Sequence, residues 1–483
     1  MEENFVIDTG NKEFQDALSL IQYTSQSVFL TGKAGTGKST FLKYVCEHTK
    51  KKYVVLAPTG IAAINAGGST MHSFFKLPFY PLLPDDPNLS LQRGRIHEFF
   101  KYTKPHRKLL EQIELIIIDE ISMVRADIID AIDRILRVYS HNLREPFGGK
   151  QLLLVGDVFQ LEPVVKNDER EILNRFYPTP YFFSARVFGQ IDLVSIELQK
   201  VYRQTDPVFV GVLDHIRTNT AGAADLQLLN TRYGSQIEES EADMYITLAT
   251  RRDTVDSINE KKLAELPGES ITFEGVIEGD FPESSLPTSQ ELVLKPGAQI
   301  IFIKNDFDRR WVNGTIGVIA GIDEEEETIY VITDDGKECD VKRDSWRNIR
   351  YRYNEKTKEI EEEVLGSFTQ YPIRLAWAIT VHKSQGLTFS RVVIDFTGGV
   401  FAGGQAYVAL SRCTSLDGIQ LKKPINRADI FVRPEIVNFA GRFNNRQAID
   451  KALKQAQADV QYAAAARAFN KGDMEECLEQ FFR

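Results

Sequence analysis

The chain has 483 residues, of which 43% are hydrophobic and 26% charged, a composition that excludes a disordered or fibrous protein and suggests about three domains. Its net charge of −10 argues against binding nucleic acid over the whole surface but allows a local basic groove. The four cysteines form no CxxC pair, the N-terminus is acidic, and no apolar run reaches ~18 residues. These features exclude a disulfide scaffold, a zinc ribbon, a secretory signal and a membrane span, so we expect a protein of the reducing cytoplasm.

Short apolar strands alternate with helical stretches over roughly the first 200 residues. We expect strands at VFL (28–30), YVVLAP (53–58), LIIID (115–119) and QLLLVGD (151–157). Continuously apolar strands separated by helices indicate a parallel sheet that is covered on both faces. The predicted fold class is therefore α/β with a doubly wound core. Prolines recur at every third position from Pro78 to Pro87, so we expect 73–110 to leave the sheet as an insertion.

In the remainder of the chain the predicted secondary-structure pattern changes twice. A second α/β pattern covers 191–260, begins with VSIEL (194–198) and resumes after 366. Between its two parts, 291–365 contains short strands and turns such as Asn313-Gly314, which predict a small inserted β-barrel. From about 446 the chain is Ala-rich and predicted to be helical.

A phosphate-binding loop follows the first predicted strand. Residues 32–39 read GKAGTGKS, which fits G-x-x-x-x-G-K-[ST] in full, and a helix follows directly. This strand–loop–helix context distinguishes the motif from a coincidental glycine-rich turn. Its glycines let backbone N–H groups converge on phosphate oxygens, and the helix N-terminus adds partial positive charge. Lys38 can reach the β and γ phosphates, and the Ser39 hydroxyl can bind Mg²⁺.

Polar residues end two later strands of the same predicted sheet. Asp119 and Glu120 follow LIII, where a carboxylate can reach Mg²⁺ and its neighbour can polarise a water molecule. The dipeptide is commonplace alone, but beside a phosphate loop it favours hydrolysis over nucleotide binding. Gln160 follows the next strand and is placed to face the γ phosphate, although taken alone it is better explained as a polar loop residue.

Several longer motifs follow one another along the chain: GKAGTGKST (32–40), LAPTGIAAINAGGSTMHSFF (56–75), IIIDEISMV (116–124), PFGGKQLLLVGDVFQLEPV (146–164), ELQKVYRQ (197–204), AITVHKSQGLTF (378–389) and YVALSRCTSLDGI (407–419). With them the chain resembles the superfamily-one DNA helicases. Within these it looks most like the Pif-type (petite integration frequency) branch, superfamily 1B, with RecD-like enzymes as relatives. The resemblance covers about 10–435.

The resemblance implies two RecA-like P-loop NTPase domains with ATP between them and single-stranded DNA across their tops. The first would cover 1–190, with a small wedge insertion at about 73–110. The second would cover 191–290 and 366–435, interrupted by an SH3-like β-barrel at 291–365, and 436–483 would form a helical tail. The chain has no counterpart of the long N-terminal extension of eukaryotic members, so we expect a bacterial, nucleoid-associated helicase.

The resemblance also implies the composition of the ATP site. Arg203 and Arg412 match arginines that reach the γ phosphate from the second domain, where guanidinium groups stabilise the dispersed charge of the transition state. The predicted catalytic residues are Lys38, Asp119, Glu120, Gln160, Arg203 and Arg412, with Ser39 and Asp119 as Mg²⁺ ligands. The predicted ATP contacts are Gln15 (to adenine), Gly35, Thr36, Gly37, Lys38, Ser39, Thr40 and Gly386.

For DNA, the positions that match the family are Pro58, Thr59, Thr70 and His72 in the first domain and Thr380, His382 and Lys383 in the second. Hydroxyl groups, backbone amides and a few cations suit a DNA backbone track that ignores sequence. The two histidines are otherwise ordinary polar loop residues. Phe74, Phe75 and Trp311 are candidate stacking platforms for bases, with burial in the core as the more common alternative.

The predicted function is that of an ATP- and Mg²⁺-dependent helicase that translocates 5′ to 3′ on single-stranded DNA and unwinds forked or tailed duplexes. The polarity comes from the family alone, as do an interest in G-quadruplexes and RNA–DNA hybrids and roles in DNA repair, recombination and telomere maintenance. We expect a monomer without a membrane partner. The alternatives are an ATPase subunit of a recombination nuclease, a DNA-binding nucleotide switch without enzymatic activity, and a helicase acting on RNA. Intact Glu120, Arg203 and Arg412 argue against the switch.

Overall fold

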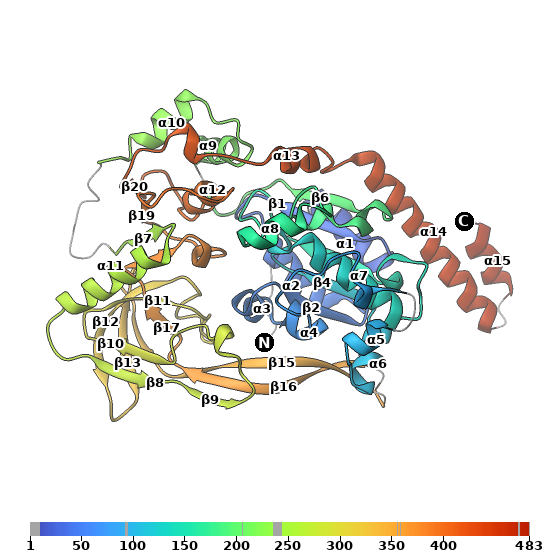
Figure 1. Cartoon of the computed structure of the whole chain (residues 1–483), viewed down its shortest axis with the longest axis horizontal. Coiled ribbons are helices and arrows are strands. Elements are labelled where there is room, and N and C mark those ends of the chain that lie inside the picture. The colour runs from blue at the N-terminus through green and yellow to red at the C-terminus, as the bar shows by residue number, and fades with distance from the viewer. Residues whose placement is uncertain are drawn as a thin grey trace.

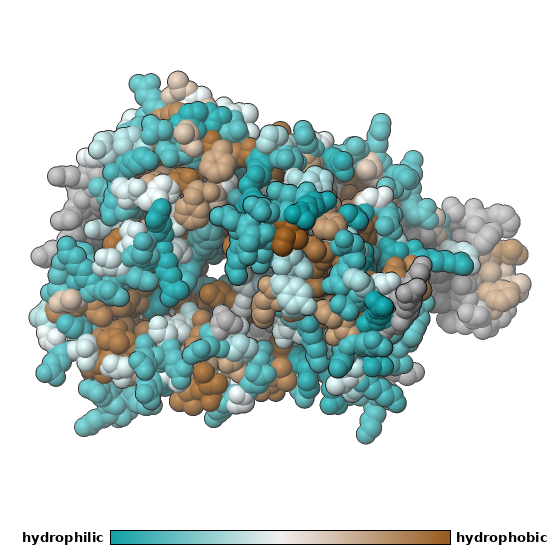
Figure 2. All heavy atoms as spheres, viewed as in Figure 1, coloured by the Kyte–Doolittle hydropathy of each residue, from teal (hydrophilic) through white to brown (hydrophobic). Residues whose placement is uncertain are grey.

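The computed structural model describes residues 10–91, 95–204, 206–234, 244–354, 356–357, 359–471 and 474–482. It has two α/β lobes side by side, a β-rich region that adjoins the second lobe, and a helical tail that leaves the first lobe (Figure 1). The face in Figure 2 is predominantly hydrophilic, and a small opening lies near its centre. Within the described ranges, no helix is both long enough and apolar enough to cross a membrane.

The first lobe is built on a six-stranded parallel sheet with the order β3-β2-β4-β5-β1-β6. Its strands are β1 (Val28–Gly32), β2 (Tyr53–Ala57), β3 (Ser69–Thr70), β4 (Leu115–Ile118), β5 (Gln151–Val155) and β6 (Val194–Leu198). Alternate residues of one strand enter cores on opposite faces: Phe29 lies in one core, and Val28 and Leu30 lie in the other. Burial on both faces explains why these strands are continuously apolar and confirms the predicted α/β class.

Helices cover both faces of this sheet. They are α1 (Lys12–Tyr23), α2 (Lys38–His48), α3 (Gly60–Ala66), α4 (Met71–Phe75), α5 (Arg95–Phe99), α6 (Lys104–Gln112), α7 (Ala126–Tyr139) and α8 (Asn167–Leu173). The predicted insertion at 73–110 contains α5, most of α6 and a 3-10 turn at Pro87–Leu89.

The candidate stacking platforms are core residues. Phe74 and Phe75 are 4% and 0% exposed and pack in the first-lobe core. Trp311 is also buried, with its ring stacked on that of Phe302 at 4.3 Å. The alternative of a core role is therefore correct for all three, and they offer no ring face to a base.

Strand β6 corrects the predicted boundary between the two α/β units. We expected VSIEL to open the second unit, but β6 pairs in parallel with β1 and completes the first sheet. The first lobe therefore extends to 198, and the first helix of the second lobe begins at Pro207. A local apolar pattern predicts a buried strand but does not say which neighbour it pairs with, because the partner is chosen by packing between distant segments.

The second lobe has a four-stranded parallel sheet with the order β18-β7-β19-β20. Its strands are β7 (Ile246–Ala249), β18 (Ala378–Thr380), β19 (Val392–Asp395) and β20 (Ile419–Leu421). Its helices are α9 (Pro207–Arg217), α10 (Ala223–Asn230), α11 (Arg252–Glu265) and α12 (Gln405–Leu410).

The β-rich region runs from 271 to 375 and is antiparallel throughout. It has a five-stranded sheet (β14-β13-β12-β11-β17), a three-stranded sheet (β15-β16-β9) and the pair β10-β8. The strands are β8 (Ile271–Glu274), β9 (Val276–Gly279), β10 (Glu291–Leu294), β11 (Gln299–Phe302), β12 (Ile316–Asp323), β13 (Thr328–Thr333), β14 (Glu338–Val341), β15 (Asp344–Asn354), β16 (Glu359–Gln370) and β17 (Ile373–Leu375).

The long β15–β16 hairpin extends along the first lobe (Figure 1). Tyr351 and Tyr353 of β15 are part of the first-lobe core, and the N–H of Val55 donates to the Tyr351 hydroxyl at 3.3 Å. The hairpin therefore ties the β-rich region to the first sheet.

The tail consists of α13 (Pro434–Ala440), α14 (Arg446–Lys471) and α15 (Met474–Phe482). At its start, α14 packs Ile449 and Ala452 into the first-lobe core, and Arg446 pairs with Asp16 of α1. Beyond this contact, α14 and α15 extend away from the body of the molecule (Figure 1).

The PFGG stretch before β5 is a turn held by α7. Phe147 is buried with a φ of 53°, and Gly148 follows with a φ of 63°. The Phe147 N–H donates to Asp133 Oδ1 at 2.6 Å, and Arg137 Nε donates to both oxygens of Asp133 at 2.9 Å. The buried Asp133 carboxylate therefore accepts hydrogen bonds both from the backbone of a strained turn and from a buried guanidinium.

We expect Asp133→Ala to lower the free energy of unfolding by about 3–5 kcal/mol, because it leaves the buried Arg137 guanidinium without its carboxylate. Chemical denaturation measures the change. Glu111→Ala is the control: it removes the exposed Lys108–Glu111 pair and is expected to cost less than about 1 kcal/mol. Equal effects of the two substitutions would contradict a structural role for Asp133.

Candidate active site

The phosphate-binding loop joins β1 to α2 and bends through two glycines in the left-handed region. Gly35 has a φ of 80° and Gly37, which precedes α2, has a φ of 88°. A Cβ at Gly35 would lie 2.4 Å from Cβ of Arg203, so a side chain at this position would displace Arg203. The N–H of Tyr202 donates to the Gly35 carbonyl at 2.8 Å. Glycine is thus required at 35 both by backbone conformation and by the close approach of the Arg203 segment.

Lys38 lies at the start of α2 with its ammonium group directed back over the loop. Its Nζ donates to the carbonyls of Gly32 at 2.8 Å and Lys33 at 3.0 Å. Burial lowers the pKa of Lys38, while the nearby carboxylates of Asp157 and Glu120 oppose that shift. The ammonium is therefore a poorly solvated cation that two backbone carbonyls hold against the loop.

Two carboxylates follow β4 on the opposite side of the loop. Glu120 adopts a φ of 50°, and its N–H donates to Asp119 Oδ1 at 2.9 Å. Burial, together with the charge of Asp119, raises the pKa of Glu120 to about 7. Burial also raises the pKa of Asp119. A carboxylate that titrates near neutrality is suited to accept a proton from water.

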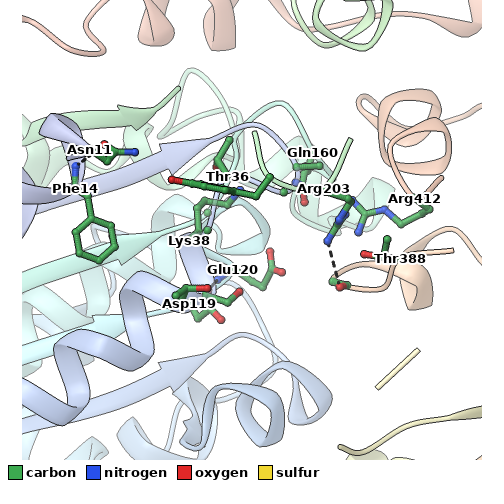
Figure 3. A pocket seen from close by; sticks show the side chains of 18 residues that line it. Asn11, Phe14, Thr36, Lys38, Asp119, Glu120, Gln160, Arg203, Thr388 and Arg412 are labelled. Atoms are coloured by element: carbon green, nitrogen blue, oxygen red, sulfur yellow. Dashed lines mark hydrogen bonds between the residues drawn. The ribbon is translucent and has the colours of Figure 1, made fainter. Parts of the chain in front are cut away.

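Two arginines approach from the other side of the cleft (Figure 3). Nη2 of Arg203 lies 3.5 Å from the Gly386 carbonyl, and its buried Nη1 has no hydrogen-bond partner among the described residues. Arg412 is 2% exposed, and its Nε donates to the Val408 carbonyl at 3.0 Å. Burial and the charge of Arg203 lower the pKa of Arg412 to about 9. Both guanidinium groups are suited to an anionic ligand.

The origin of Arg203 differs from our expectation. We placed both arginines in the second domain, but Arg203 lies in the segment that connects β6 to α9, and only Arg412, after α12, belongs to the second lobe. Because β6 is a strand of the first sheet, the chain that continues from β6 brings Arg203 directly beside the phosphate loop. The cleft therefore receives one arginine from the connection and one from the second lobe.

One cavity of about 760 Å³ collects these groups (Figure 3). The predicted residues that line it are Gly35, Thr36, Gly37, Lys38, Ser39, Thr40, Asp119, Glu120, Gln160, Arg203, Gly386 and Arg412. Each predicted catalytic residue and Mg²⁺ ligand is among them. Gln15, the predicted adenine contact, is not: it is exposed, on α1, and outside the cavity lining.

Asn11, Phe14, Tyr202 and Thr388 also line the cavity, and sequence reasoning missed them. Asn11 is the N-cap of α1, and its Oδ1 accepts from the Phe14 N–H at 3.1 Å. Gln15 follows Phe14 by one residue, and a rotation of about 100° around the helix directs it elsewhere. The asparagine at the N-cap position could have predicted where α1 begins. The sequence does not indicate which face of this helix contacts the phosphate loop.

The predicted DNA contacts divide into two groups. Thr59, His382 and Lys383 line a second cavity of about 310 Å³, which shares Ser39, Asp119, Glu120 and Gly386 with the first. Pro58, Thr70, His72 and Thr380 lie outside that lining.

Local structural roles also account for several of these residues. The hydroxyls of Thr59 and Thr70 accept from backbone N–H groups at the starts of α3 and α4, and Thr380 accepts from the Lys383 N–H. The His72 ring stacks on that of Phe79 at 5.1 Å. Burial lowers the pKa of His382 and of Lys383.

Comparison with known proteins decides the family. A family model described as PIF1-like helicase matches residues 9–211. The ATP-dependent DNA helicase Pif1 of Campylobacter jejuni is 34% identical over 412 residues, which cover 82% of this chain and 88% of the relative. The chain belongs to the PIF1-like helicase family. The resemblance drawn from the sequence motifs is thereby confirmed.

Solved structures of a PIF1-like relative match most of the chain. A crystal structure of Bacteroides sp Pif1 in complex with ADP-AlF4 has a TM-score of 0.81 at 42% identity and covers 89% of this chain and 96% of that one. Bacteroides Pif1 bound to ssDNA has a TM-score of 0.64 at the same identity and covers 90% and 97%.

We expect the kcat of ATP hydrolysis to rise about tenfold between pH 6 and pH 8, because Glu120 must lose its proton to act as a base and its pKa is about 7. Steady-state ATPase measurements at saturating ATP test this. Glu120→Gln should retain less than about 1% of kcat. A kcat that does not change over this pH range would contradict the assignment.

Proposed function

We propose that this protein is an ATP-dependent DNA helicase that moves 5′ to 3′ along single-stranded DNA. The observation that supports the proposal most strongly is the single cavity in which a phosphate loop, an acidic pair and two arginines of different origin meet. A protein that binds ATP without hydrolysing it needs only the phosphate loop, whereas the acidic pair and the arginines serve hydrolysis.

Each cavity residue has a chemical task in this proposal. Lys38 and the loop N–H groups bind the phosphates, and Glu120 takes a proton from the attacking water. Gln160 faces the γ phosphate, and Arg203 and Arg412 stabilise the charge that develops there. Thr36, Gly37 and Thr40 complete the phosphate contacts, and Phe14 and Asn11 replace Gln15 as the nearest candidates for the base end.

Magnesium fits the donors in the cavity. The Ser39 hydroxyl and the Asp119 carboxylate are hard oxygen ligands, which Mg²⁺ prefers, and both line the cavity. Among the described residues there is no cluster of three His, Cys, Asp or Glu side chains, so water and phosphate oxygens would supply the other ligands. When bound, Mg²⁺ neutralises phosphate charge.

Movement would follow from the composite cleft. Arg412 belongs to the second lobe, whereas Lys38 belongs to the first, so both meet the phosphates only when the lobes are close. The cavity that contains Thr59, His382 and Lys383 shares its wall with the ATP cavity, so a change around the phosphates reaches these predicted DNA contacts directly. Pro58, Thr70, His72 and Thr380 would extend the track.

We also infer the domain identities. The two lobes would be RecA-like domains, divided in the connection between β6 and α9, with the segment at 73–110 as a small wedge insertion. The β-rich region from 271 to 375 would contain the SH3-like barrel, with the β15–β16 hairpin as its link to the first domain. The parallel sheets of the lobes and the antiparallel sheets between them support this division.

The finer substrate range rests on the family. The 5′-to-3′ polarity, a preference for G-quadruplexes or RNA–DNA hybrids, a monomeric state and association with a bacterial nucleoid belong to the proposal as expectations. Action on single-stranded and forked DNA is supported by a structure of Bacteroides Pif1 bound to ssDNA and by a Pif1 structure described as the basis for DNA unwinding at forked dsDNA by two coordinating helicases.

We expect Lys38→Ala to lower ssDNA-stimulated ATPase activity by more than about 100-fold, because the cation that binds the phosphates is lost. Binding to a fluorescent oligonucleotide should remain measurable. Lys50→Ala, which removes an exposed cation after the same helix, is the control and should keep normal turnover. Turnover retained in Lys38→Ala would remove the catalytic assignment.

We expect unwinding of a duplex with a 5′ single-stranded tail and none with a 3′ tail. A strand-displacement assay with matched DNA substrates measures this, and an RNA-tailed substrate in the same assay tests RNA as the track. Unwinding from the 3′ tail would overturn the polarity. ATPase stimulation without unwinding of either substrate would favour the motor subunit of a larger enzyme, and no stimulation at all would favour the nucleotide switch.

A further inference from the structure

A buried ion pair joins the lobes behind the ATP cavity. Arg217, the last residue of α9 in the second lobe, is 3% exposed. Its Nη2 lies 3.1 Å from Oδ1 of Asp157, which follows β5, and its Nη1 lies 2.8 Å from Oε1 of Glu197 in β6. Burial opposes the charge of Arg217, but Asp157 and Glu197 together hold its pKa above the usual range. One guanidinium of the second lobe therefore binds two carboxylates of the first.

The same guanidinium contacts the turn that presents Gln160 to the cavity. It lies over the Phe159 ring, 4.4 Å from the centroid. The Phe159 N–H donates to Asp157 Oδ1 at 3.1 Å, and the Gln160 N–H donates to the Asp157 carbonyl at 3.0 Å. Arg217 thus binds the carboxylate that organises this turn and the ring inside it, although it does not line the ATP cavity itself.

A second contact packs the second lobe against this turn. Gly404, the residue before α12, has a φ of 81°, and a Cβ there would lie 2.2 Å from the Gln160 carbonyl oxygen. The helix that begins at this contact ends two residues before Arg412. The turn around Gln160 is therefore enclosed between α9 and α12, the two second-lobe helices that carry Arg217 and precede Arg412.

We propose that Arg217 is a positioning residue that holds the Asp157–Gln160 turn against the second lobe, so that Gln160 meets the γ phosphate only when α9 is in place. The inference rests on the proposed ATPase function and adds that the position of the second lobe determines the position of Gln160. A planar guanidinium that binds two carboxylates and stacks on a ring has a fixed orientation, which an ammonium group cannot reproduce.

Arg217→Lys tests this in the full-length protein, because it keeps the charge and removes the fork and the stacking. We expect the kcat of ssDNA-stimulated ATP hydrolysis to fall about tenfold and the KM for ATP to change less than about threefold, since phosphate-loop binding is untouched. The control is His215→Gln, two residues earlier on α9. It removes the exposed His215–Asp225 pair, which lies within the second lobe, and should leave kcat within about twofold.

A kinetic cycle with Gln160→Ala separates positioning from general stabilisation. If Arg217 acts through Gln160, adding Arg217→Lys to Gln160→Ala should change kcat by less than about twofold. Additive losses, or an Arg217→Lys enzyme with normal kcat, would overturn the proposal. Binding of a fluorescent ATP analogue confirms that each variant is folded.

Should Arg217→Lys fail to fold, Phe159→Leu takes its place in the same cycle, because it removes the ring and retains the ion pair. The wild-type control identifies the other kind of failure. A wild-type protein without ssDNA-stimulated ATPase activity would overturn the proposed function, whereas an active wild type with additive variants would overturn only the role of Arg217.

Discussion

The organisation of this protein depends on the contact between its phosphate loop and the residues that arrive from beyond the first sheet. Gly35 accepts a hydrogen bond from the Tyr202 N–H, and its Cα lies against the Arg203 side chain. The neighbouring Ala34 N–H donates to the Tyr407 hydroxyl of α12 at 2.9 Å. Since these contacts involve loop backbone, the loop cannot shift without the connecting segment and the second lobe responding. Phosphate binding and lobe position are therefore linked by direct contact.

Buried charge is the second organising feature. The cleft brings together three cations, Lys38, Arg203 and Arg412, with two carboxylates, Asp119 and Glu120. Burial lowers the pKa of the cations and raises the pKa of the carboxylates, so it favours the neutral form of each group. Groups that are only partly compensated interact strongly with a charged ligand, because little solvent screens them. An acidic protein can thus present a local site for a phosphate group.

The β-rich region shows that a domain inserted in the chain need not be an appendage. Tyr351 and Tyr353 of its long hairpin are core residues of the first lobe, although the chain enters and leaves the region from the second. The region therefore bridges both lobes, and its position is coupled to theirs by packed side chains.

Sequence alone determined the phosphate loop, the acidic pair after β4, Gln160 and the parallel strands that hold them, because glycine-rich turns, strand ends and continuous apolar runs are local patterns with local physical causes. It also predicted Arg203 and Arg412, through the family motifs. Only the tertiary structure decided that β6 completes the first sheet, that Arg203 comes from the connection, that Phe14 rather than Gln15 faces the cavity, and that Arg217 reaches Asp157. Each of these depends on which distant segments pack together, and that choice is made by the summed burial and charge of the whole chain rather than by any short stretch of it.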